Sequence, residues 1–212
     1  MTTHYDDEAQ ADQLKKWLKE NYLALAAGLA VGLSAVFGYQ GWQNHKSQRG
    51  AAASQVYEDL KKELAAEHAD LAKPLLDKLS GEYADTPYAA AAQLQAAAAS
   101  VRASQFDEAL THLKWVSEHS KDEGLKQVAQ LRQARVLWQQ NKIDEALVLL
   151  KDDKGAFAAL VQELRGDILV AKGDRAAARS DYEKALAATP EGQPNRMLLQ
   201  RKLDDLSGAV QS

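Results

Sequence analysis

Charged residues are absent from Asn21 to Asn44, and the apolar run inside this stretch covers residues 22–42. A helix rises about 1.5 Å per residue, so this run would be roughly 30 Å long, which is the thickness of the hydrocarbon core of a bilayer. Aromatic rings, which favour the headgroup level, mark both ends: Trp17, Tyr22, Tyr39 and Trp42. The pattern predicts one transmembrane helix over residues 22–42.

A buried core helix and a cleaved signal peptide both fit this segment less well than a spanning helix. Helices in the cores of soluble proteins rarely continue this far without a charged residue. A cleaved signal peptide would have a leading region that contains five acidic residues, and this segment ends in aromatic residues and Gln instead of a small-x-small cleavage site. We therefore expect a retained membrane anchor.

Basic residues near the span give a weak preference for its orientation. Three precede it and two follow it: Lys15, Lys16, Lys19, Lys46 and Arg49. This count favours a cytoplasmic N-terminus, but a window widened to Lys62 reverses it. Gly28 and Gly32 have the small-x-x-x-small spacing that lets helices approach closely in lipid, and both helix association and ordinary composition remain open as its cause.

After Gly50 the apolar residues recur at helical spacing, and short polar breaks separate the segments. Thr86-Pro87 predicts the start of a helix that runs to about Ala103. Lys172-Gly173-Asp174 predicts the end of one helix and the start of another, which Thr189-Pro190 ends. Elements of about 12 to 18 residues with short connections predict antiparallel neighbours.

Further helices are predicted at the two ends of this region. Residues 51–71 read as one long helix, followed by a shorter helix from Pro74 to about Leu79, and the two form a capping hairpin. Residues 194–206 predict an amphipathic helix that covers the last apolar face of the array. The apolar residues assigned to that closing helix are Met197, Leu198, Leu203 and Leu206.

A similar unit recurs around Ala109, Ala146 and Ala178, at intervals close to the roughly 34 residues of a tetratricopeptide repeat. Small residues let the two helices of a hairpin touch, and a proline stops the second helix. The last unit has these residue types at the offsets of the repeat: Gly166, Gly173, Ala178, Tyr182, Ala185 and Pro190. The first two units lack the proline, and in an alanine-rich chain their similarity could also arise by chance.

Composition supports an all-helical protein and argues against nucleic-acid binding and cysteine chemistry. Alanine contributes 39 of the 212 residues and aromatic residues only 7%, which opposes a sheet protein and favours the all-α class. The net charge of −4 argues against nucleic acid as a partner. The absence of cysteine excludes disulfides, thiolate zinc sites and cysteine catalysis.

The sequence contains no arrangement of residues that indicates catalysis. No two of the five histidines lie four residues apart around a glutamate, and His112 and His119, which are seven apart, lack an evident third ligand. Phosphate-binding, serine-nucleophile and dinucleotide motifs are also missing. We predict a protein that is not an enzyme and that needs no cofactor or metal.

Stacked hairpins curve, and the first helix of each pair lines the concave side, where we expect binding. In the repeat register this groove receives Arg102, Arg135, Trp138, Glu163 and Asp167, with Leu94 and Leu131 between them. An alternative is that Trp138 and the leucines only pack against neighbouring helices. A carboxylate clamp for acidic C-terminal tails needs Lys and Asn, but the corresponding positions hold Leu94 and Ala98.

A short acidic tail and one span precede a repeat body that contains Leu131-Arg132-Gln133-Ala134-Arg135-Val136 and Leu164-Arg165-Gly166-Asp167-Ile168-Leu169. With these features the chain resembles the YfgM-like family over almost its whole length. The resemblance implies an ancillary subunit of the bacterial SecYEG translocon, anchored in the inner membrane with its N-terminus in the cytoplasm and its repeat domain in the periplasm. The implied partners are a PpiD-like chaperone and the envelope proteins that it receives as clients.

The expected organisation is a cytoplasmic tail (1–21), a transmembrane helix (22–42), a linker (43–50) and a tetratricopeptide-like domain (51–212). A different class of function stays open, namely a scaffold that organises an envelope or division complex unrelated to secretion, or a cytoplasmic scaffold on the same anchor. The groove ligand, the clients and the oligomeric state are not determined by the sequence.

Overall fold

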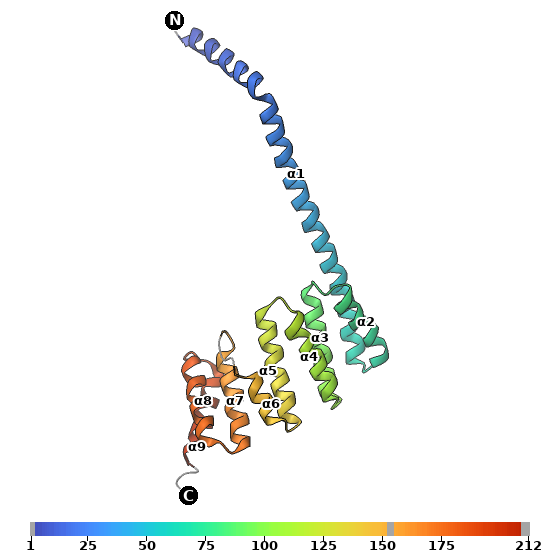
Figure 1. Cartoon of the computed structure of the whole chain (residues 1–212), viewed down its shortest axis with the longest axis vertical. Helices are drawn as coiled ribbons and strands as arrows, with labels where there is room; N and C mark the ends of the chain where they lie inside the picture. The colour runs from blue at the N-terminus through green and yellow to red at the C-terminus, as the bar shows by residue number, and fades with distance from the viewer. Residues whose placement is uncertain (1–2, 152–154, 209–212) are drawn as a thin grey trace. The chain divides into compact units, whose positions relative to one another are not determined.

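The computed structural model describes residues 3–151 and 155–208, which contain helices and connecting turns but no strand (Figure 1). This confirms the predicted all-α class with one long N-terminal apolar helix. The chain divides into two compact units, Met1–Ala51 and Ala52–Ser212. The helices in the described ranges are α1 (Thr3–Ala65), α2 (Ala69–Gly81), α3 (Pro87–Arg102), α4 (Phe106–His119), α5 (Glu123–Gln139), α6 (Ile143–Leu149), α7 (Ala158–Lys172), α8 (Arg175–Ala188) and α9 (Pro194–Gly208).

Helix α1 contains the predicted span. Its most apolar 18-residue window has a mean hydropathy of 1.7, and none of that window is buried in the protein. Large apolar side chains such as Leu23, Val31 and Phe37 are exposed along it. A continuous apolar surface of this size is unfavourable in water and matches the interior of a bilayer.

Residues 43–50, which we expected to form a linker, belong to α1 and are helical. The stretch contains no proline, and its single glycine, Gly50, has open space around it and a helical backbone. No residue in the stretch therefore interrupts the helix. Further along α1, Ala53 and Leu60 are buried in a core cluster, and their packing stabilises the part of α1 that follows the stretch.

The first hairpin of the second unit differs from the prediction in where its helices end. The expected helix over residues 51–71 stops at Ala65, because Glu67 has a left-handed φ of 58°. The next helix begins at Ala69 instead of Pro74, so Pro74 lies inside α2. Ala72, Leu76 and Leu79 are all buried on one face of α2, and this packing outweighs the backbone hydrogen bond that Pro74 removes.

The predicted breaks in the repeat region occur where the sequence indicated them. Helix α3 begins at Pro87, and α7 ends at Lys172, where Gly173 adopts a φ of 90° that a side chain would disfavour. The carboxylate of Asp174 then accepts a hydrogen bond from the Ala177 amide and caps α8. Helix α8 ends at Ala188, before Pro190. Consecutive helices from α3 to α8 therefore form three hairpins, as Figure 1 shows.

A buried alanine recurs in each of these hairpins. Ala109, Ala146 and Ala178 are fully buried, one in the second helix of each hairpin. The middle hairpin is irregular, because α6 has only seven residues and is shorter than the expected 12 to 18. The recurrence of alanine therefore identified the hairpins, although it did not set the length of each helix.

Helix α9 covers the last hairpin. Leu199, Leu203 and Leu206 are buried in one cluster with Ala178, Tyr182 and Ala185 of α8. The predicted apolar face was partly wrong, since Met197 and Leu198 are 67% and 49% exposed. Positions 199, 203 and 206 follow the i, i+4, i+7 spacing of one helical face, and residues 197 and 198 lie outside it.

Candidate protein-binding site

The last hairpin is built on close contact between α7 and α8. A Cβ atom at Gly166 would lie 2.5 Å from Cε1 and 2.6 Å from Cδ1 of Tyr182, so the aromatic ring occupies the place of a side chain. Arg165 forms two hydrogen bonds with the buried carboxylate of Asp181, at 2.6 and 2.7 Å. Its third hydrogen bond, to the carbonyl oxygen of Leu150, ties the end of α6 to the same point. These contacts hold α7 against α8 and the end of α6.

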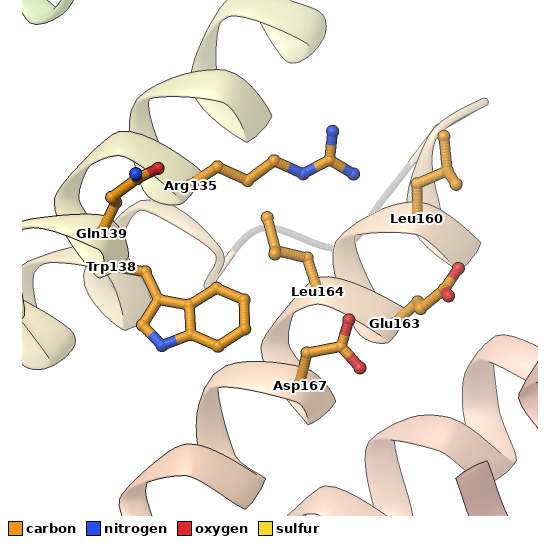
Figure 2. Close-up of a pocket in the computed structure, with 7 residues that line it drawn as sticks. All are labelled: Arg135, Trp138, Gln139, Leu160, Glu163, Leu164 and Asp167. Atoms are coloured by element: carbon orange, nitrogen blue, oxygen red, sulfur yellow. The ribbon is translucent and has the colours of Figure 1, made fainter. Parts of the chain in front are cut away.

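A pocket of about 490 Å³ lies between α5 and α7 (Figure 2). It is lined by Arg135, Trp138, Gln139, Leu160, Glu163, Leu164 and Asp167. The α5 residues are spaced i, i+3, i+4 and the α7 residues i, i+3, i+4, i+7, so each set occupies one helical face. Four of the five predicted groove residues meet here, and the repeat register was sufficient to find them.

The structure also differs from the expected groove at several positions. Arg102, at the end of α3, is exposed and does not line the pocket. Leu131 is buried in the core, and Leu94 of α3 packs against a cluster that includes residues of α4 and α5. Neither leucine contributes to this surface. Sequence reasoning missed Gln139, Leu160 and Leu164, although helical spacing from the predicted residues identifies them: Gln139 lies four residues after Arg135, Leu160 three before Glu163 and Leu164 three before Asp167.

Trp138 has two roles in the structure. It is partly buried and packs against the cluster of α5, α6 and α7, and it also lines the pocket. Packing against neighbouring helices and contact with a ligand are therefore compatible at this residue. In Figure 2 its indole lies across the pocket from Leu164 and Asp167, and the Arg135 side chain extends above both.

Lys202 of α9 is bound to both acidic residues of the pocket. Its Nζ atom lies 2.8 Å from Oε1 of Glu163, and 2.7 and 2.9 Å from the two carboxylate oxygens of Asp167. The hydroxyl of Tyr182 donates a further hydrogen bond of 2.7 Å to Asp167. The Lys202 ammonium also lies 5.6 Å from the centre of the Tyr182 ring, within the range of a cation–π contact.

Two pKa shifts describe this cluster. Burial acts to lower the pKa of Lys202, but hydrogen bonds to Asp167 and Glu163 and their negative charges outweigh it, and the pKa is raised above its ordinary value. Burial raises the pKa of Tyr182, and its hydrogen bond to Asp167 raises it further. Lys202 is therefore charged and Tyr182 neutral throughout the physiological range.

A second pocket, of about 570 Å³ and largely apolar, lies between α4, α5 and α6. Sequence reasoning did not anticipate it, because it lies between α4 of the first hairpin and the irregular middle hairpin. Lining residues include Leu110, Leu137, Val148 and Leu149. Across residues 3–151 and 155–208 no group of three or more His, Cys, Asp or Glu side chains is arranged to hold a metal ion.

Comparisons with known proteins agree with this architecture. A family model described as a tetratricopeptide repeat-like domain matches residues 15–208. A protein of Escherichia coli K12 named "Ancillary SecYEG translocon subunit" is 32% identical over 208 residues, which are 98% of this chain and 100% of the relative. Proteins of the same name from Haemophilus influenzae and Neisseria gonorrhoeae are 32% and 33% identical. These two alignments cover 87% and 97% of this chain, and 91% and 100% of the relatives.

Proposed function

Because this chain belongs to the family of ancillary SecYEG translocon subunits with a tetratricopeptide repeat-like domain, we propose that it is a non-enzymatic subunit of the translocon. In this role it binds a PpiD-like periplasmic chaperone and assists the transfer of translocated envelope proteins to it. The observation that carries the proposal is the extent of the similarity, which covers both the apolar helix and the repeat-like domain of this chain.

The proposed location is the bacterial inner membrane, with a single span, the N-terminus in the cytoplasm and the repeat domain in the periplasm. The slight excess of lysine before the span supports this orientation. Alkaline phosphatase or green fluorescent protein fused after Ser212 distinguishes the two sides, since the phosphatase is active only outside the cytoplasm. Fluorescence without phosphatase activity would refute the periplasmic assignment.

Two separate surfaces serve the proposed function. The exposed apolar face of α1 is available to the translocon within the membrane, and the pocket between α5 and α7 is available to a chaperone or client. Arg135 and Trp138 are of the residue types that most often contribute the largest share of binding energy at protein interfaces, and both lie beside apolar side chains.

The two surfaces are tested separately on tagged full-length protein purified in mild detergent. Replacement of residues 22–42 by an unrelated spanning helix should reduce co-purification of the translocon and leave the repeat domain folded. Trp138→Ala should reduce capture of the chaperone without releasing the protein from the membrane. Site-specific crosslinking from residues 22–42 and from the pocket, with identification of the products by mass, provides the partner assignment.

One result would replace this proposal by the scaffold function. If the purified protein captures neither translocon nor chaperone at physiological salt but associates strongly with itself, an organising role in the envelope fits better. Replacement of the span with no change in translocon capture would show instead that the contact is made by another part of the chain.

A further inference from the structure

The two acidic residues of the pocket are paired with a lysine, whereas its arginine is not paired with an acid among the described residues. Lys202 already binds Glu163 and Asp167, and these three side chains are mostly buried, with 23%, 15% and 26% of their surface exposed. Arg135, on the opposite helix, is exposed and makes no ion pair or side-chain hydrogen bond with any residue in the described ranges. The unpaired charge that this pocket offers to a ligand is therefore positive.

Apolar side chains lie directly beside that charge. Leu160, on the α7 side, is 38% exposed, Trp138 is partly exposed on the α5 side, and Leu164, which is only 3% exposed, closes the bottom of the pocket between them. In Figure 2 the guanidinium of Arg135 reaches over Leu164 toward Leu160. The guanidinium of Arg135 can bind a carboxylate of a ligand through two parallel hydrogen bonds. Aromatic and aliphatic surface lies next to it.

We propose that the pocket binds a segment of a partner protein in which an acidic side chain lies next to a large apolar side chain. Arg135 pairs with the acidic group, and Trp138 and Leu160 contact the apolar one above the buried Leu164. This inference rests on the proposed function, since it specifies the chemistry of the chaperone or client segment that the repeat domain receives. A basic segment is disfavoured, because Lys202 already occupies the two carboxylates and Arg135 repels a second cation.

Lys202 sets the charge preference of the pocket without needing to touch the ligand. Without it, Glu163 and Asp167 would present two uncompensated negative charges to the ligand and to Arg135. The helix that carries it stays attached by other contacts, because Arg196 donates hydrogen bonds of 2.7 Å to the carbonyl oxygens of Leu186 and Thr189. The acidic-segment preference thus depends on α9 being docked.

The binding test uses full-length protein in detergent micelles at about 0.15 M salt, where charges separated by more than about 8 Å are screened. Three short fluorescent peptides share one frame: Phe and Leu alternating with Glu, the same with Lys in place of Glu, and the first with Ser in place of Phe and Leu. Anisotropy titration gives a dissociation constant for each. We expect the apolar acidic peptide to bind at least tenfold more tightly than the other two.

Single substitutions on α5 assign the effect to the pocket. Arg135→Glu and Trp138→Ala should each weaken the apolar acidic peptide at least tenfold, equivalent to about 1.4 kcal/mol, whereas Arg135→Lys keeps the charge and should lose less. Arg132→Glu is the matched control, because Arg132 is exposed one turn earlier on α5 and does not line the pocket. It should change the affinity by less than about twofold.

Two variants separate the charge of Lys202 from its structural role. Lys202→Met should weaken the apolar acidic peptide and strengthen the apolar basic one. The triple variant with Lys202→Met, Glu163→Gln and Asp167→Asn removes all three charges and should restore the preference for the acidic peptide. Circular dichroism confirms that each variant is folded.

The proposal fails if the basic peptide binds as tightly as the acidic one, if Arg132→Glu weakens binding as much as Arg135→Glu, or if no peptide binds up to about 1 mM. These failures are distinct from failure of the proposed function. Co-purification of translocon and chaperone with Arg135→Glu at unchanged yield would refute the ligand class alone. If the unmodified chain binds the peptide but co-purifies neither the translocon nor the chaperone, only the translocon role is refuted.

Discussion

Gly166→Ala tests the packing of the last hairpin, because two opposing effects of similar size meet at this residue. Alanine is favoured over glycine inside a helix by up to about 1 kcal/mol. Against this, the new Cβ would lie 2.5 Å from Cε1 of Tyr182, and the ring belongs to a side chain that is only 3% exposed. Overpacking of this kind costs about 1 to 3 kcal/mol.

The displacement of the ring adds a second cost. The Tyr182 hydroxyl donates a 2.7 Å hydrogen bond to Asp167, and a hydrogen bond to a charged group contributes about 1.5 to 3 kcal/mol. Even if this hydrogen bond is only partly lost, the free-energy cost of overpacking and of the weakened hydrogen bond exceeds the gain from replacing glycine by alanine in the helix. We expect a net destabilisation of about 2 kcal/mol, or a fall in Tm of roughly 4 to 8 °C for a domain of this size.

Thermal unfolding of the fragment from Gly50 to Ser212 measures the effect. Gly81→Ala is the control, since Gly81 is also helical but has no heavy atom within 4 Å of an added Cβ, and it should be neutral or slightly stabilising. In a Tyr182→Ala background, Gly166→Ala should become stabilising, because the obstructing ring is gone. An unchanged or raised Tm for the single variant Gly166→Ala would refute the contact between α7 and α8.

Three further predictions concern the same domain. Ala178→Leu should lower its stability by about 1 to 3 kcal/mol in urea unfolding, because Ala178 is fully buried against α9, and an unchanged midpoint would contradict that packing. Arg165→Met should cost about 3 kcal/mol by removing two hydrogen bonds from the buried Asp181 carboxylate, which among the described residues keeps only the exposed Lys184 at 3.6 Å, and adding Asp181→Leu should recover most of the loss. Burial lowers the pKa of His112 despite the nearby Glu108, so the unfolded chain binds a proton that the folded chain resists. The urea midpoint should therefore fall as pH decreases below about 6.5, and His112→Gln should reduce this dependence.

Local signals predicted most of the fold correctly. Prolines and glycines that punctuate helices placed the start of α3, the end of α7 and both ends of α8, because their effect on the backbone is independent of distant residues. The long apolar helix was predicted equally directly, since the length of the run of residues 22–42 and its lack of charge are read from the sequence itself. These features needed no knowledge of tertiary contacts.

The errors occurred where packing overrides local preference. Pro74 favours a helix start, but the buried face of Ala72, Leu76 and Leu79 continues the helix through it. The polar stretch 43–50 resembled a linker, yet no residue in it terminates a helix that is continuous on both sides. In each case the outcome depends on contacts made by residues outside the misjudged segment.

The candidate site was predictable in position but not in charge. The repeat register placed Arg135, Trp138, Glu163 and Asp167 together, and from sequence their charges were mixed. Lys202 lies 35 residues beyond Asp167 in the chain, in a helix expected only to cover an apolar face. Its binding to both acids could not be inferred from periodicity, and it changes which charge remains for a ligand.

Helix α9 also limits how this domain can change in size during evolution. Repeat arrays often lengthen by duplication of a hairpin, which requires each unit to present the same face to the next. Here the outer face of α8 is committed to Leu199, Leu203 and Leu206, and Lys202 bonds back to α7. An added hairpin at this end would have to displace α9 entirely, so gain or loss of a repeat is easier upstream of α7.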